Sequence, residues 1–131
     1  MNYTDIISKW KEKKIDSIEK LDQQLSNFRI TFAYNSGTIE NQQITYHATR
    51  EVFENGKVIN FCGDTQTIFE IENQKKCYNF LVPKIINKDP ITSDLIKKIH
   101  YQLMQGVYDE HRWQKGERPG HYKIHDYVLG K

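Results

Sequence analysis

Long hydrophobic runs are absent from this sequence. No stretch approaches the roughly 20 apolar residues that a membrane-spanning helix needs, and residues 1–14 hold no apolar run of signal-peptide length. The chain also lacks internal repeats and any linker rich in Gly, Ser or Pro. We therefore expect one cytoplasmic domain, or part of one, that does not contact a membrane.

Cysteine and charge of one sign are also scarce. Cys62 and Cys77 have no second Cys or His at metal-binding spacing, so we expect reduced thiols and no metal site. The 19 basic and 17 acidic residues give a net charge of +2, which does not indicate a nucleic-acid or membrane surface. The remaining composition, with 37% hydrophobic residues, is typical of a folded domain.

Helical periodicity dominates what is present. Apolar residues recur at steps of three and four over residues 18–32, which predicts one amphipathic helix laid against a core. The stretch Tyr34-Asn35-Ser36-Gly37 has low helix propensity, so we expect that helix to break there. Four more helices are predicted to begin after Thr4, Thr45, Asp64 and Thr92, and to end near Lys13, Gly56, Ile86 and Gly106.

The periodicity weakens after Gly106. Residues 107–121 are expected to form a loop, and the alternating run over residues 122–129 predicts a strand exposed on one face. Trp113 stands among basic residues, as aromatic residues do on nucleic-acid surfaces. However, residues 107–131 hold five Lys or Arg against four Asp or Glu. We therefore favour a flexible loop and expect no nucleic-acid partner.

The most informative stretch reads Ser36-Gly37-Thr38-Ile39-Glu40-Asn41. In a helix, the Ser36 hydroxyl and the Glu40 carboxylate would lie on one face, one turn apart. The stretch resembles the inhibitory motif of Fic-domain proteins, in which Ser or Thr, three spacers and Glu precede Gly or Asn. Further pieces follow in that family's order: a cap at Thr45, Glu72-Asn73, Ile99-His100, Leu103-Met104, Gly106, and Gly120-His121-Tyr122-Lys123 where the family has Gly-x-Tyr-Arg.

This resemblance implies an all-α, Fic-like helical bundle with a short β-hairpin, called the flap, near the C-terminus. The flap would dock a target protein by strand addition, and the residues that correspond to it are Tyr122, Lys123, Ile124 and His125. Lys123 departs from the family's arginine and lacks its planar bidentate fork.

Fic enzymes use ATP and magnesium to transfer AMP to a protein hydroxyl. Their catalytic signature, His-Pro-Phe-x-Asp-Gly-Asn-Gly-Arg, is not present in these residues. We therefore expect no catalytic residue, no cofactor and no AMP transfer for this chain alone, and we interpret residues 1–131 as the N-terminal part of a truncated Fic-like domain.

Two functions stay open on this basis. In the first, the chain is the regulatory and flap part of an auto-inhibited Fic adenylyltransferase, and its partner is the missing catalytic half. Glu40 would then pair with an arginine that otherwise holds the ATP γ-phosphate. Ser36 would orient the turn, and Asn41 would be a turn residue that tolerates positive φ.

In the second, the chain is complete at 131 residues and is a catalytically dead module. It would bind or inhibit another Fic chain, or form a homo-oligomer through an unpaired flap edge. A plainer alternative is that Glu40 is an ordinary solvated carboxylate near a helix end.

Overall fold

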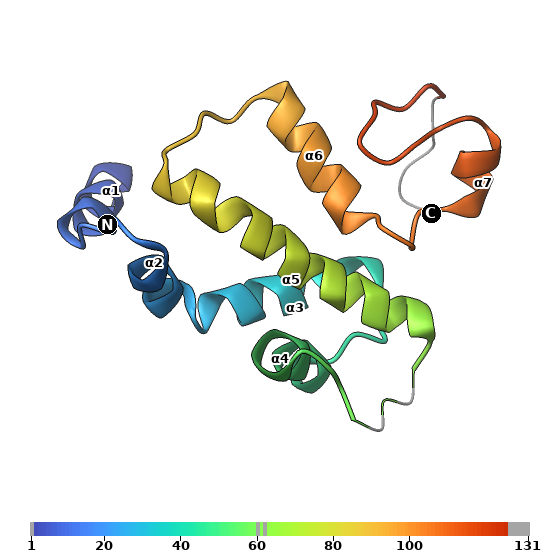
Figure 1. Ribbon diagram of the computed structural model, residues 1–131, viewed down its shortest axis with the longest axis horizontal. Helices are drawn as coiled ribbons and strands as arrows, with labels where there is room; N and C mark the ends of the chain where they lie inside the picture. Colours follow the sequence, from blue (N-terminus) through green and yellow to red (C-terminus); the bar gives the residue numbers. More distant parts are fainter. Residues whose placement is uncertain (1, 60, 62, 126–131) are drawn as a thin grey trace.

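A computed structural model describes residues 2–59, 61 and 63–125 of the chain. This described part is all-helical and contains no strand. The central element is α5, which contacts α2, α3, α4 and α6 and crosses the middle of the molecule in Figure 1. The helices are α1 (Tyr3–Glu12), α2 (Ile18–Leu25), α3 (Phe28–Glu40), α4 (Tyr46–Asn55), α5 (Thr65–Ile86), α6 (Ser93–Leu103) and α7 (Glu110–Gln114).

Short-range capping explains where most helices begin and end. The hydroxyl of Thr45 accepts a hydrogen bond from the Ala48 amide at the start of α4, and Gly56 ends that helix in the left-handed region at φ 81°. Thr92 caps α6 in the same way. These predicted boundaries are confirmed. The cap of α1 was predicted wrongly, because Asn2 rather than Thr4 forms it, in a reciprocal capping box with Asp5.

The single helix predicted over residues 18–32 is wrong, because the structure divides it into α2 and α3. Ser26 and Asn27 separate the two helices, and the Ser26 hydroxyl donates to the Gln23 carbonyl at 3.3 Å. Such side chains compete for backbone hydrogen bonds and favour a break. The resulting change of direction buries Ile30 but leaves Phe28 and Phe32, which were predicted to face the core, exposed.

The break predicted at residues 34–37 is also wrong, since α3 continues through it to Glu40. Gly37 is buried inside the helix, and a Cβ atom there would lie 2.9 Å from Cδ1 of Ile44. The glycine therefore allows close approach between α3 and the segment that leads into α4, rather than a turn.

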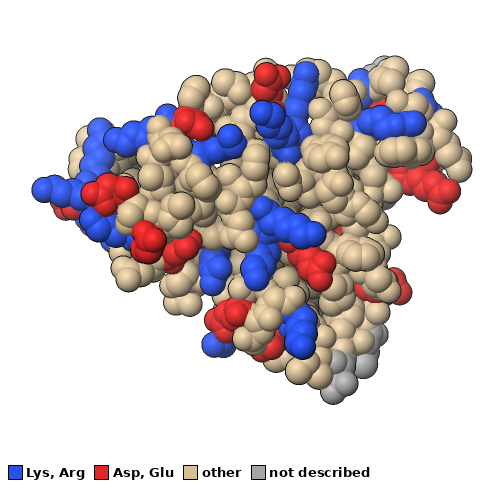
Figure 2. Space-filling model, viewed as in Figure 1, with Lys and Arg blue, Asp and Glu red and all other residues tan. Residues whose placement is uncertain are grey.

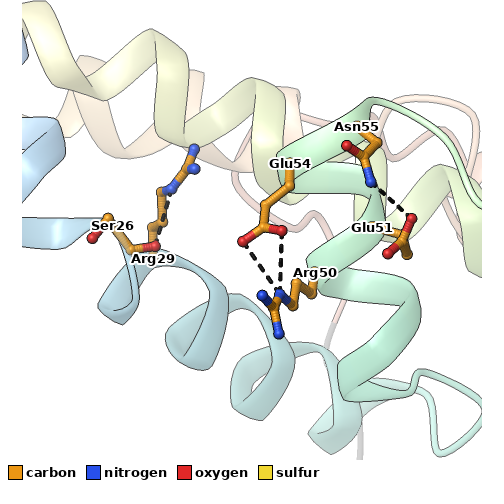
Figure 3. Close-up of polar contacts among 6 residues, drawn as sticks. All are labelled: Ser26, Arg29, Arg50, Glu51, Glu54 and Asn55. Atoms are coloured by element: carbon orange, nitrogen blue, oxygen red, sulfur yellow. Dashed lines mark hydrogen bonds and ion pairs between the residues drawn. The ribbon is translucent and has the colours of Figure 1, made fainter.

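Two small clusters form the core around α3, α4 and α5. One contains Ile44, Ala48, Val52 and Ile71, and the other contains Ile30, Ala33 and Phe53. Both clusters use the inner face of α4. The outer side of α4 carries polar pairs instead, and Figure 3 shows Arg50 against Glu54 and Asn55 against Glu51.

Polar contacts of Arg29 in α3 and Tyr78 in α5 close the cluster around Phe53. The Arg29 guanidinium lies 5.5 Å from the Phe53 ring centre and 5.8 Å from that of Tyr78. Its Nε donates to the Ser26 carbonyl at 3.3 Å (Figure 3). The Tyr78 hydroxyl donates to Asp22 at 2.8 Å. These contacts fix α2 and the first turn of α3 onto α5.

The C-terminal part departs from the prediction in two ways. Residues 110–114 form α7, capped by the Asp109 side chain, where only a loop was expected. The predicted flap strand is wrong over residues 122–125, which adopt no strand. A lone strand has no partner to satisfy its backbone groups. The rest of that predicted strand, residues 126–129, lies outside the described residues.

Candidate functional site

Ser36 and Glu40 both lie in α3, one helical turn apart. Ser36 is half-buried, whereas Glu40 is exposed and is the last residue of the helix. Within the described part of the chain, the Glu40 carboxylate has no hydrogen-bond or ion-pair partner. The structure therefore places a carboxylate at the end of a helix, directed to solvent.

Asn41, next to that carboxylate, ties the end of α3 to α5. Its side-chain Nδ2 donates to Thr67 Oγ1 at 2.9 Å and to Glu70 Oε2 at 2.8 Å. Its Oδ1 accepts from the Gln43 amide at 2.9 Å. Thr67 is completely buried and Glu70 half-buried, so these bonds lie partly out of water. Asn41 has an extended backbone at φ −146°, so the explanation by positive φ is wrong.

A second polar link holds the chain just after Asn41. The Gln43 side chain donates to Asp64 Oδ2 at 3.2 Å and accepts from the Asp64 amide at 3.4 Å. Asp64 is the residue that precedes α5. Together with Asn41, this link fixes the segment between α3 and α4 against the first turns of α5. The position of the Glu40 backbone is therefore set by side chains outside its own helix.

The outer face of α3 is apolar and uncovered. Phe28, Phe32 and Ile39 are 58%, 56% and 81% exposed, and the two phenylalanine rings are 5.7 Å apart. Their spacing of four and seven places them on one side of the helix, and Glu40 lies at the edge of that side. We call Phe28, Phe32 and Ile39 the outer stripe of α3. Sequence periodicity missed it because Phe28 and Phe32 fit an inward-facing pattern equally well, and Ile39 lies beyond the break that was predicted at residues 34–37.

The predicted flap residues lie against α6 and α7. Tyr122, Lys123, Ile124 and His125 are all exposed. The Lys97 ammonium lies 4.4 Å from the Tyr122 ring centre, and His125 Nε2 is 3.1 Å from the Lys115 carbonyl oxygen. No hydrogen bond or ring contact among the described residues joins this segment to Ser36, Glu40 or Asn41. The structure thus keeps the two groups of predicted site residues apart.

Two residues of the resemblance have structural roles around α6. Asn73 is buried, and its Nδ2 donates to the carbonyls of Leu103 and Gln105 at 3.1 and 2.7 Å, where the end of α6 leaves such groups without helical partners. His100 is half-buried, and its Nδ1 accepts from the Gly120 amide at 2.9 Å. Burial, assisted by the charge of Arg112, lowers the pKa of His100.

The basic and aromatic residues near Trp113 contact one another. The Arg118 guanidinium lies 3.7 Å from the Trp113 ring centre, and its Nη1 donates to the Trp113 and Glu117 carbonyls. Glu117 is buried, and its Oε2 has no hydrogen-bond partner in the part of the chain that the structure describes. The aromatic face that a nucleotide base would stack on is therefore shared with an arginine of the same chain.

The described residues hold no group of three or more His, Cys, Asp or Glu side chains placed to bind a metal ion. Nor does the described part contain a helix of the length and apolarity that crossing a membrane requires. Cys77 is buried with a free thiol, whose pKa is raised by burial, and Cys62 lies outside the described residues. No family model, curated protein or solved structure matches the chain.

Proposed function

We propose that this chain is the N-terminal regulatory and flap part of a Fic protein adenylyltransferase, and that Glu40 holds the enzyme in its inhibited state. The single observation that carries the proposal is the placement of Glu40. An exposed carboxylate with no partner among the described residues ends a helix whose last turn is tied to α5 through Asn41. The resemblance of residues 36–41 to the inhibitory motif implies an inhibitory role for that carboxylate.

The physical basis of inhibition would be a charge-assisted bond from Glu40 to an arginine of the catalytic half. That arginine otherwise holds the ATP γ-phosphate, so the carboxylate would neutralise it and occupy its place. The links from Asn41 and Gln43 fix the helix end before the partner arrives. A carboxylate on a fixed backbone loses less conformational freedom on pairing than one on a mobile loop.

The outer stripe of α3 supports the same proposal. Three large apolar side chains in a row, beside the inhibitory carboxylate, are a surface that association with another protein surface would bury. The catalytic half would cover Phe28, Phe32 and Ile39 while it presents its arginine to Glu40. This arrangement would couple docking of the two halves to blockage of the nucleotide site.

ATP and magnesium do not fit the residues present here. The described residues offer no cluster of three metal-ligating side chains. The helix starts at Thr45, Asp64 and Thr92 carry no glycine-rich phosphate loop. Nucleotide and metal would therefore bind to the catalytic half, and this chain alone should transfer no labelled AMP. Labelled protein that disappears when magnesium is chelated would refute that statement.

The experiment on regulation uses the protein in which these residues are continuous with a catalytic signature. Glu40→Gly should raise AMP transfer from ATP by roughly 10–100-fold, because a hydrogen bond to a charged group contributes about 1.5–3 kcal/mol. Glu12→Gly is the matched control, since Glu12 is also an exposed glutamate at the last position of a helix. An unchanged rate in Glu40→Gly would remove Glu40 from the inhibitory role.

A second candidate function uses the same exposed carboxylate in trans. A dead module of 131 residues would offer Glu40 to the arginine of a separate Fic chain. Added to a Fic enzyme that lacks its own inhibitory helix, the wild-type chain should slow AMP transfer and the Glu40→Gly variant should not. A natural stop codon after Lys131 would favour this function, whereas an in-frame catalytic signature would favour the first.

A further inference from the structure

Helix α1 is separate from the rest of the described chain. It contacts no other helix, and none of its residues is buried. Figure 1 shows it at one end of the molecule, beyond α2. Its local support is a capping box formed by Asn2 and Asp5 at its start and backbone hydrogen bonds from Lys13 and Lys14 at its end. Isolated helices of this length are marginal in water, so a surface that α1 packs against would complete its stability.

The side chains of α1 are arranged in three zones. Tyr3, Ile6, Ile7 and Trp10 follow the spacing of three, four and seven that places them on one side, and they are 84%, 51%, 51% and 43% exposed. A shallow hollow along this side is lined by Ile6, Ile7 and Trp10 and by three lysines, Lys9, Lys11 and Lys13.

The helical positions place Lys9 and Lys13 on one edge of the apolar side and Lys11 on the other. The acidic residues Asp5 and Glu12 lie with Ser8 along a different hollow, on the side opposite the apolar one, and Lys9 lies between the two hollows and lines both. Positive charge therefore borders the apolar face on both edges, and negative charge is kept behind it. Figure 2 shows several blue side chains, with red ones among them, at the end of the molecule that α1 forms.

We propose that α1 binds flat on an anionic lipid membrane, with Tyr3, Ile6, Ile7 and Trp10 inserted at the level of the headgroups. An amphipathic helix of this kind binds through its apolar area and through attraction to anionic lipids. Trp and Tyr favour this interfacial depth, and the lysine stems can cover the apolar edge while their ammonium groups reach the phosphates.

The charge pattern favours a membrane over a groove on another protein. A flat anionic surface meets both edges of the helix equally, which matches lysines on both sides of the apolar face and acids only on its back. Residues 13–17, which join α1 to α2, carry no helix, so α1 is not continuous with the helices that surround the core.

Neither the absence of long apolar runs nor the net charge of the whole chain, from which no membrane contact was expected, bears on a short amphipathic helix. Residues 3–14 hold four lysines against two acids, a local net charge of +2 that equals that of all 131 residues. Basic and acidic residues balance in the remainder of the chain, so the net charge of the whole chain does not show that lysines concentrate in residues 3–14. Charge averaged over the chain therefore could not reveal a short basic helix.

The test uses the full chain with Trp113→Phe, so that Trp10 is the only tryptophan. The probes are vesicles of phosphatidylcholine with one-third phosphatidylserine, and vesicles of phosphatidylcholine alone. We expect co-sedimentation with the anionic vesicles and a blue shift of Trp10 fluorescence on binding. Binding to the neutral vesicles should be at least about tenfold weaker, because each lysine near an anionic surface contributes favourably.

Two sets of variants separate the charge from the apolar face. Reversal to glutamate at Lys9, Lys11 and Lys13, or Ile6→Asn with Ile7→Asn, should each weaken binding to anionic vesicles by at least about tenfold. The charge-matched control reverses Lys57, Lys76 and Lys98, which are exposed on other parts of the chain, and should change binding less than about twofold. Because α1 contacts no other helix, its variants should keep the wild-type melting temperature.

Several outcomes would overturn the proposal. These are equal binding to both kinds of vesicle, full binding by the isoleucine variants, or equal weakening by the control set. A Trp10 blue shift that appears without vesicles, together with a dimer in sedimentation, would assign the apolar face to a second copy of the chain. None of these readouts involves AMP transfer, so membrane binding by α1 is tested independently of the role of Glu40.

Discussion

Replacing Asn41 by alanine tests whether the inhibitory helix end is held by α5. Asn41 makes three side-chain hydrogen bonds, to Thr67, Glu70 and the Gln43 amide. Two of these partners belong to α5, and all three bonds disappear in Asn41→Ala. The substitution leaves the helical part of α3 unchanged, since Asn41 already has an extended backbone.

The expected loss of stability can be worked from the partners. A hydrogen bond to an ionised carboxylate contributes about 1.5–3 kcal/mol and a neutral one about 1 kcal/mol. Glu70 keeps a second hydrogen bond, from Gln66 at 3.1 Å, so we expect the bond from Asn41 to Glu70 to contribute about 1.5 kcal/mol. Thr67 is 0% exposed, so its hydroxyl would lose a partner that water cannot replace. We expect Asn41→Ala to lower the free energy of unfolding by about 3 kcal/mol, and the melting temperature by roughly 10 °C.

The assay is urea unfolding at pH 7, followed by far-ultraviolet circular dichroism. Asn55→Ala is the control, because Asn55 also donates from Nδ2 to a glutamate, Glu51, at 2.9 Å (Figure 3). That pair lies exposed on one helix, so its loss should cost no more than about 0.5 kcal/mol. Equal losses in the two variants would refute the reasoning that Asn41 fixes α3 to α5.

Two further substitutions test the packing of α3 and the contact between α2 and α5. Gly37→Ala should change the free energy of unfolding by less than about 1 kcal/mol, because better helix propensity offsets the displacement of Ile44. In an Ile44→Val background, which lacks Cδ1, the same substitution should stabilise the protein. The same effect in both backgrounds, measured by urea unfolding, would exclude Cδ1 as the obstacle. Burial, and next the bond to Asp22, raises the pKa of Tyr78 from 10.0 to about 12. Tyr78→Phe should therefore lower the free energy of unfolding by about 1–2 kcal/mol below pH 10. This difference from wild type should vanish as the pH rises towards 12. A difference that stays constant over that pH range in urea unfolding would contradict the assignment.

Features set by neighbouring residues in the sequence could be predicted. The caps at Thr45 and Thr92 depend on an amide only three residues away, and Gly56 ends α4 through its own backbone conformation. The high helical content follows from such signals, whereas the helix that reaches Glu40 does not, since a break was expected at residues 34–37. The same reasoning placed the start of α1 at Thr4 although Asn2 was available, because two good cap residues close together compete.

Features set by distant residues could not be predicted. Steps of three and four fit one helix as well as two, so periodicity could not detect the break at Ser26 and Asn27. A glycine at position 37 is compatible both with a helix break and with close packing beneath Ile44, and only tertiary packing decides which of the two occurs. Asn41 was interpreted as a turn residue because its partners, Thr67 and Glu70, are more than 25 residues away.

The chemistry at the edges of the two uncovered apolar faces argues for different partners. The outer stripe of α3 is bordered by Glu40, a single carboxylate on a fixed helix end, which suits an arginine delivered by a protein of complementary shape. The apolar side of α1 is bordered by lysines on a helix that no other helix restrains, which suits a broad anionic surface. A lipid surface would repel the carboxylate beside the α3 stripe, and a protein groove would need acids on both of its rims to accept α1. Vesicle binding should therefore be lost through α1 variants while Glu40→Gly leaves it unchanged.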